Sequence, residues 1–177
     1  MPHPLTFIAK AWRRFRRNRR GSAAIEFAMI APMFIGLLFA IIETGLVFYA
    51  SQVLETVTQD SARMIMTGQA QNAAYTQAQF KAYVCSQVVA LFDCTNGIYV
   101  DVQSYSSFGS VNVADPITAK AFVPPNNYSP GGPGDIVVVR LFYQWPIFVT
   151  GLGFNLSNLN GSKRLLTATA AFQNEPF

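Results

Sequence analysis

The sequence has few charged side chains and almost no histidine. Only 12% of its 177 residues are Asp, Glu, Lys or Arg, whereas 51% are hydrophobic. Ordinary soluble domains carry roughly twice that share of charge. Part of the apolar surplus is therefore expected to face lipid. The length allows one modest domain with a membrane segment, and two full domains are not expected.

Residues for catalysis and for metal binding are scarce. The one histidine, His3, stands near the N-terminus, so no Ser-His-Asp or Cys-His arrangement is predicted in the rest of the chain. Two cysteines cannot supply the four ligands of a structural zinc site. Four aspartates are predicted at strand ends and in loops, where aspartate is typically a turn residue: Asp93, Asp101, Asp115 and Asp135. Neither an enzyme nor a metal or cofactor site is predicted.

The positive charge is concentrated at the N-terminus. The formal net charge is +4, but from Ser22 onward six basic residues stand against nine acidic ones, a net charge of −3. A nucleic-acid-binding domain needs its basic patch on the folded part, so no nucleic-acid partner is predicted. The other seven of the 13 basic residues precede Gly21: Lys10, Arg13, Arg14, Arg16, Arg17, Arg19 and Arg20.

A long apolar segment follows this basic cluster. Residues 27–50, FAMIAPMFIGLLFAIIETGLVFYA, contain one charged residue, Glu43. As a helix they would extend about 36 Å, enough for a hydrocarbon core of about 30 Å. The positive-inside rule places the N-terminus in the cytoplasm and the remainder outside. The predicted organisation is a basic leader at 1–21, a transmembrane helix at 22–50 and an outer domain at 51–177.

The boundary between basic leader and apolar helix carries a recognisable motif. Gly21 follows the basic cluster, and Glu26 is the fifth residue after it. This arrangement resembles a type IV prepilin leader, which prepilin peptidase cuts on the cytoplasmic side of the membrane. More narrowly, GSAAIEFAMIAPMFIGLLFAIIETGLVFYA is similar to the TadE-like pseudopilins of tight-adherence (Tad, Flp) pilus systems. The terminal FQNEPF, residues 172–177, is similar to a signature that many of these proteins carry.

The resemblance implies a minor pseudopilin that acts in pilus biogenesis and surface adhesion. It would be cut after Gly21 and held in the bacterial inner membrane with a periplasmic domain, and it would either remain there or enter an extracellular pilus. Its implied partners are the prepilin peptidase, other pilins or pseudopilins, the pilus assembly platform and membrane lipid. The alternative is an uncleaved single-pass scaffold of the same machinery.

Two acidic residues stand in or beside the apolar segment. Cleavage would make Ser22 the N-terminus, and Glu26 can pair with the freed amine on its own helix or on a neighbouring subunit, because ionised groups at low dielectric need partners. The simpler interpretation of Glu26 is a favourable interaction with the helix macrodipole. For Glu43 two surroundings remain open: hydration at the outer interface, or burial against another subunit or the assembly platform.

The sequence of the outer domain predicts helices followed by strands. Helical spacing of Leu54, Val57, Met64 and Ile65 extends the first helix beyond the membrane, and a second amphipathic helix is predicted at 76–92. Strands are predicted at 98–103, 117–123, 135–145 and 165–172, with a turn-rich loop at 124–135. Helices before strands favour a pilin-like α+β fold with a mostly antiparallel sheet.

The two cysteines, Cys85 and Cys94, lie on the predicted outer side of the membrane, where thiols are oxidised, so a disulfide is expected. Three glycosylation sequons, at Asn127, Asn155 and Asn160, leave a rival class open, a eukaryotic single-pass protein with a glycosylated ectodomain. That interpretation explains neither the Gly21 and Glu26 motif nor the terminal FQNEPF.

Overall fold

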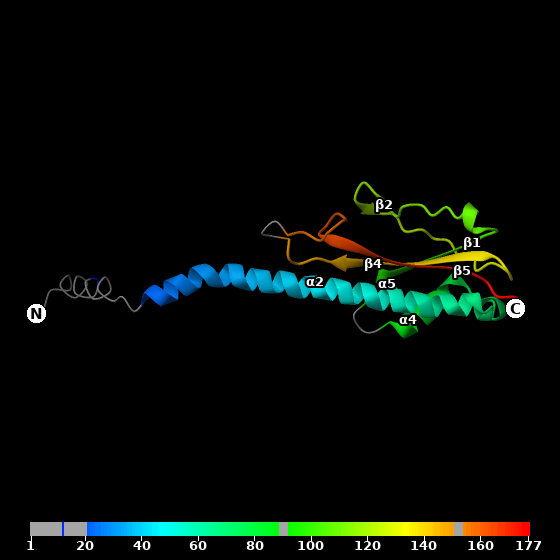
Figure 1. The fold of residues 1–177 in the computed structure, drawn as a ribbon, viewed down its shortest axis with the longest axis horizontal. Helices are drawn as coiled ribbons and strands as arrows, with labels where there is room; N and C mark the ends of the chain where they lie inside the picture. The colour runs from blue at the N-terminus through cyan, green and yellow to red at the C-terminus, as the bar shows by residue number, and fades with distance from the viewer. Residues whose placement is uncertain (1–11, 13–20, 89–91, 151–153) are drawn as a thin grey trace, which may run out of the picture. The chain divides into compact units, whose positions relative to one another are not determined.

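The computed structural model describes residues 12, 21–88, 92–150 and 154–177 of the chain (Figure 1). The predicted leader, with its seven basic residues and His3, lies outside the described residues except for Trp12 and Gly21. The chain divides into two compact units, Met1–Ile41 and Ile42–Phe177.

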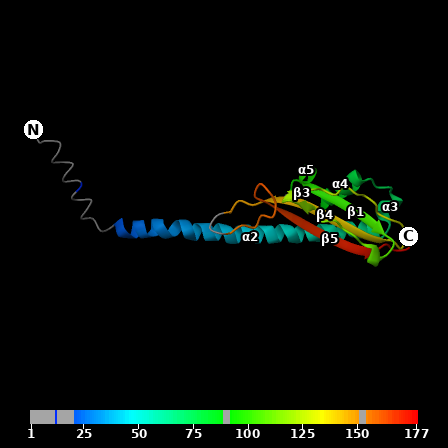
Figure 2. The same cartoon turned by 90° about the horizontal axis from the view of Figure 1, so that it is seen from above.

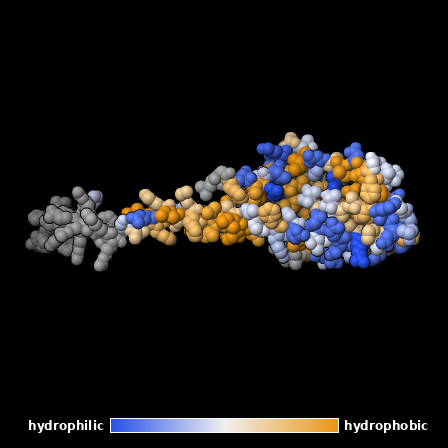
Figure 3. Space-filling model, viewed as in Figure 1, coloured by the Kyte–Doolittle hydropathy of each residue, from blue (hydrophilic) through white to orange (hydrophobic). Residues whose placement is uncertain are grey.

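The first long element is helix α2, Ser22–Met66, which contains the predicted transmembrane helix and its extension. Within the described residues, α2 is the helix long and apolar enough to cross a membrane. Its large apolar side chains between Ile25 and Tyr49 are exposed, except for the buried Val47, and Figure 3 shows mainly apolar surface on this stretch. An apolar surface of this length fits a single-pass membrane protein.

The unit Ile42–Phe177 is built around a three-stranded antiparallel sheet. The strands are β1 (Ile98–Tyr105), β4 (Ile136–Pro146) and β5 (Lys163–Gln173), in the order β1-β4-β5, and Figure 2 shows them side by side. Short helices join α2 to the sheet: α3 (Gln69–Asn72), α4 (Gln77–Gln87) and α5 (Cys94–Gly97). A 3-10 turn, η2 (Phe108–Ser110), follows β1. The predicted α+β class is confirmed.

The main core forms where α2 and α4 pack on one face of the sheet. Alternating strand residues point into it, among them Val102 and Leu141, and they meet Leu54 of α2 and Phe80 of α4. Helix α4 begins at a capping box, in which the Thr76 side chain accepts a hydrogen bond from the backbone of Gln79. The apolar spacing that predicted both helices thus corresponds to their buried faces.

Two predicted elements differ from the structure. The expected strand at 117–123 is a hairpin, β2 (Ile117–Thr118) and β3 (Ala121–Phe122), in a separate sheet. Its two turn residues, Ala119 and Lys120, have φ of 50° and 60°, which reverses the chain as in a primed hairpin turn. Helix α4 ends at Gln87, short of residue 92. Burial on α2 begins at Glu43, and Val47 and Ala50 are buried as well.

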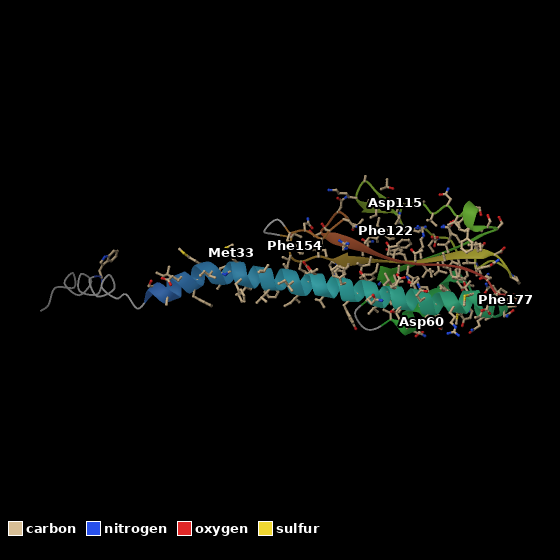
Figure 4. The ribbon with its side chains drawn as sticks, in the orientation of Figure 1. Met33, Asp60, Asp115, Phe122, Phe154 and Phe177 are labelled. Atoms are coloured by element: carbon tan, nitrogen blue, oxygen red, sulfur yellow. A yellow bond between two sulfur atoms is a disulfide. The ribbon has the colours of Figure 1, made fainter. Side chains whose placement is uncertain are left out.

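The hairpin β2-β3 covers the other face of the sheet. The Phe122 ring packs against Tyr99 and Phe142, with ring centroids 5.0 and 5.6 Å away (Figure 4). This second, smaller core also contains Leu159 and Leu165. The sheet is therefore covered on both sides, by helices on one face and by a hairpin on the other.

Candidate functional site

The predicted processing site lies at the first turn of α2. Ser22 is the first residue of the helix, and its Oγ donates a hydrogen bond of 2.9 Å to Glu26 Oε1. Both side chains are exposed, as is Gly21, whose hypothetical Cβ would have no neighbour within 4 Å. The carboxylate of Glu26 thus lies one turn from the start of the helix, on the side of Ser22. Peptidase cleavage after Gly21 stays a prediction.

Glu43 has surroundings that the sequence did not indicate. Its side chain is 6% exposed and accepts hydrogen bonds from two backbone N–H groups, those of Phe148 at 2.5 Å and Val149 at 3.0 Å. These residues directly follow β4. Instead of solvent or another subunit, Glu43 contacts the connection between β4 and β5 of its own chain.

The C-terminal motif ties several parts of the domain together. The Asn174 side-chain amide donates to the carbonyls of Pro130 and Gly132, at 3.0 and 2.9 Å, and its backbone N–H donates to Asp135 at 2.9 Å. The next residue, Glu175, donates its N–H to the carbonyl of Met66, the last residue of α2, at 2.9 Å. One of the carbonyls that a helix end leaves unpaired is thereby satisfied.

The last residue of the chain packs directly beyond the end of α2. Gly68 has φ +74, and a Cβ at this position would lie 2.2 Å from the ring of Phe177. Glycine is therefore required twice, for its backbone conformation and for the close approach of the ring. Figure 4 shows Phe177 at this end of α2. The terminal signature thus connects the loop 130–135 to the end of α2.

A buried ion pair lies on the hairpin side of the sheet. Asp101 was predicted at a strand end, and this prediction is wrong: it lies within β1, opposite Arg140 of β4. Arg140 Nη2 is 2.7 Å from Asp101 Oδ2, and the two side chains are 6% and 1% exposed. Arg140 also donates to the carbonyl of Ala114 at 2.9 Å. The sequence signal was a charged residue inside each of two apolar strands, but only the strand register places the two opposite each other.

The other three aspartates do serve as turn residues, as predicted. Asp93 accepts a hydrogen bond from the backbone of Asn96 at the start of α5. Asp115 and Asp135 each accept a bond from a backbone N–H two or three residues away. In the described part of the chain, no group of three or more His, Cys, Asp and Glu side chains could hold a metal ion.

The expected disulfide is confirmed. Cys85 of α4 and Cys94 of α5 are bonded, with their Cα atoms 5.6 Å apart, which is an ordinary separation for a disulfide. The bond connects the end of α4 to the short helix that leads into β1. It therefore links two helices through residues that are nine positions apart in the sequence.

The family comparison concerns the N-terminal part of the chain. Residues 21–63 match the family model described as TadE-like protein, which confirms the resemblance drawn from Gly21, Glu26 and the apolar helix. The match suggests a Tad pilus-associated protein. No curated protein and no solved structure matches the chain. The sheet, its hairpin and the C-terminal motif lie outside the matched residues.

Proposed function

We propose that the protein is a minor pseudopilin of a Tad/Flp-type pilus assembly and secretion system. In this proposal prepilin peptidase removes residues 1–21 on the cytoplasmic side, and α2 holds the mature protein in the bacterial inner membrane. The domain stands in the periplasm, where the protein acts in pilus biogenesis and surface adhesion with other pilins or pseudopilins and the assembly platform.

The observation that carries the proposal is the contact between Ser22 and Glu26 at the start of a TadE-like helix. Cleavage after Gly21 would place an ammonium group on Ser22, whose Oγ already lies 2.9 Å from the Glu26 carboxylate. A rotation of one side chain brings the two charges together. Pairing them offsets the cost of holding either charge at the edge of a low-dielectric membrane, and the helix macrodipole favours the carboxylate at the same position.

Two further features support the proposed topology. The disulfide between Cys85 and Cys94 is of the kind that forms in the bacterial periplasm and seldom in the cytosol. The basic residues before Gly21 favour a cytoplasmic N-terminus. The domain is large beside the short major pilins of the resembling systems, which favours a low-copy component over the bulk subunit.

Substitutions at the boundary test the proposal in cells. Gly21→Leu should accumulate at full length, because a bulky side chain obstructs the peptidase at the scissile bond. Glu26→Ala should be processed normally yet fail in pilus assembly, whereas Glu55→Ala, a matched change farther along α2, should leave both steps intact. Processing is read by gel mobility and assembly by pilus yield. Normal maturation of Gly21→Leu would contradict the proposal, and wild-type piliation of Glu26→Ala would remove the pairing role.

One observation favours the alternative of an uncleaved inner-membrane scaffold. In the full-length chain Glu26 already accepts a hydrogen bond from Ser22, so the carboxylate has a partner without any cleavage. A scaffold of this kind would keep residues 1–21 in the membrane fraction at all times. The same cells would still need the protein for pilus assembly, and Gly21→Leu would then assemble pili normally.

A further inference from the structure

The connection that follows β4 holds one aromatic side chain away from the protein. Ile147 is buried, and its N–H donates to the carbonyl of Ser162 at 2.8 Å, which closes the base of the connection. The next residue, Phe148, is 82% exposed, the largest exposure among the large hydrophobic side chains of the described residues. The connection is therefore anchored at Ile147 and presents Phe148 outward.

This connection lies at a defined position along α2. The carboxylate of Glu43 binds the N–H groups of Phe148 and Val149, which places the start of the connection beside α2. Ile42, Leu46 and Tyr49, neighbours of Glu43 on the same helix, expose 45 to 55% of their surface. All three belong to the apolar run assigned to the membrane. Lipid that covers these helix residues would reach Phe148 as well.

The first backbone N–H groups of the connection are satisfied within the protein, which favours a position at membrane depth. Irregular backbone is tolerated in the hydrocarbon region only when protein groups satisfy its N–H and C=O groups. Glu43 accepts from the N–H groups of Phe148 and Val149, and Ser162 accepts from that of Ile147. Three consecutive donors at the start of an irregular segment thus have acceptors within the protein.

The charges near the connection suit a lipid headgroup layer. Residues 146–162 contain neither Asp nor Glu, and β5 then begins with Lys163 and Arg164. In the sheet register these two residues pair with Pro146 and Trp145, so they lie at the same end of the sheet as Phe148. Cationic side chains attract lipid phosphates, and tryptophan is favoured at the membrane interface.

We infer that residues 147–150, here called the Phe148 segment, insert into the outer leaflet of the membrane that α2 spans. Phe148 contacts lipid acyl chains, Lys163 and Arg164 lie among the headgroups, and Glu43 fastens the segment to the helix. The domain then has a second membrane contact beside α2, which limits its rotation about the helix. The inference rests on the membrane span in the proposed function.

The test uses the full chain, one copy per lipid nanodisc, with a nitroxide spin label at Phe148→Cys. Both native cysteines are held in the disulfide, so the introduced thiol is labelled selectively without reductant. The matched control is Phe108→Cys in η2, also an exposed phenylalanine at 62%. It follows the end of β1 that pairs with Ile136, the opposite end of β4 from Pro146. Leu38→Cys provides a reference within the apolar run.

Compared with the label at 108, the label at 148 is expected to collide severalfold more often with oxygen, because oxygen concentrates in lipid. It is expected to collide severalfold less often with a polar nickel chelate. Its values should approach those at Leu38. If the label at 148 is as accessible to the nickel chelate as the label at 108, the inference is wrong. If the label at Leu38 still reports lipid in that experiment, the membrane span itself remains supported. An immobile label at 148, protected from both reagents, would mean that protein covers the segment and would also overturn it. A water-exposed label at Leu38 would remove the span and the inference together.

Discussion

Removal of the Asp101 carboxylate should destabilise the domain strongly, because it leaves the Arg140 guanidinium buried without its anion. The carboxylate accepts from Arg140 Nε and Nη2 at 2.9 and 2.7 Å, and from the amides of Asn127 and Gln103 at 3.0 and 2.9 Å. In Asp101→Ala the guanidinium keeps the carbonyl of Ala114 and its position 5.3 Å from the Phe142 ring centroid. Neither supplies a compensating negative charge.

The size of the effect follows from burial. With side chains only 6% and 1% exposed, water cannot replace the missing partner, and breaking such a pair typically costs about 3–5 kcal/mol. A small domain has a total stability of roughly 5–15 kcal/mol, so Asp101→Ala removes a large part of it. The double variant Asp101→Leu/Arg140→Met removes both charges and should cost less than Asp101→Ala alone, since apolar replacement of a buried pair is often close to neutral.

The assay is denaturant unfolding of the full chain in detergent micelles, followed by near-UV circular dichroism. Asp115→Ala serves as the control, because Asp115 is exposed and makes one hydrogen bond, to the backbone of Ile117; it should lose no more than about 1 kcal/mol. The reasoning would be refuted if Asp101→Ala unfolded like the Asp115→Ala control, or if the double variant were less stable than Asp101→Ala.

Three more predictions concern the domain. Cys85→Ser/Cys94→Ser should lower the free energy of unfolding by about 2–3 kcal/mol, as expected for a loop this short; labelling of both cysteines without reductant in envelope protein would refute the disulfide. Gly68→Ala should lower the free energy of unfolding by at least about 1–2 kcal/mol, since alanine is strained at φ +74. The control Gly109→Ala, with open space at Cβ, should be nearly neutral. Equal losses of unfolding free energy in the two variants would contradict this prediction. Burial and the nearby Tyr75 raise the pKa of Tyr128 above 10.0, so the folded domain retains a proton that the unfolded chain releases, and stability should fall as pH rises beyond about 10. Between about pH 9 and pH 11 the Tyr128→Phe variant should lose less stability than the wild type. Equal losses in the two proteins would show that Tyr128 does not cause the pH dependence.

Regular patterns in the sequence predicted most of the fold. The buried faces of α2 and α4 follow the spacing of Leu54, Val57 and Phe80, and the three strands of the sheet lie within two residues of their predicted limits. These elements are set by local periodicity. The hairpin β2-β3 was missed because its seven-residue segment alternates like one strand, and only the positive φ of Ala119 and Lys120 reverses it.

The long-range contacts could not be read from the sequence. Glu43 and Phe148 are 105 residues apart, and no local pattern links a carboxylate in an apolar helix to the backbone of a distant connection. The ion pair between Asp101 and Arg140 depends on strand register, which fixes residues opposite each other only once the pairing is known. At the candidate processing site the reverse holds. Ser22 and Glu26 are four residues apart on α2, about one turn, so the sequence spacing alone places their side chains on one side of the helix.

The most direct test of the central claim is the intact mass of the membrane-extracted protein in cells with and without prepilin peptidase. We predict that the mature protein lacks residues 1–21 in peptidase-positive cells and keeps them in the deletion strain. A full-length mass in both strains would contradict processing after Gly21. The protein would then be an uncleaved single-pass membrane protein, and the scaffold function would take the place of the pseudopilin.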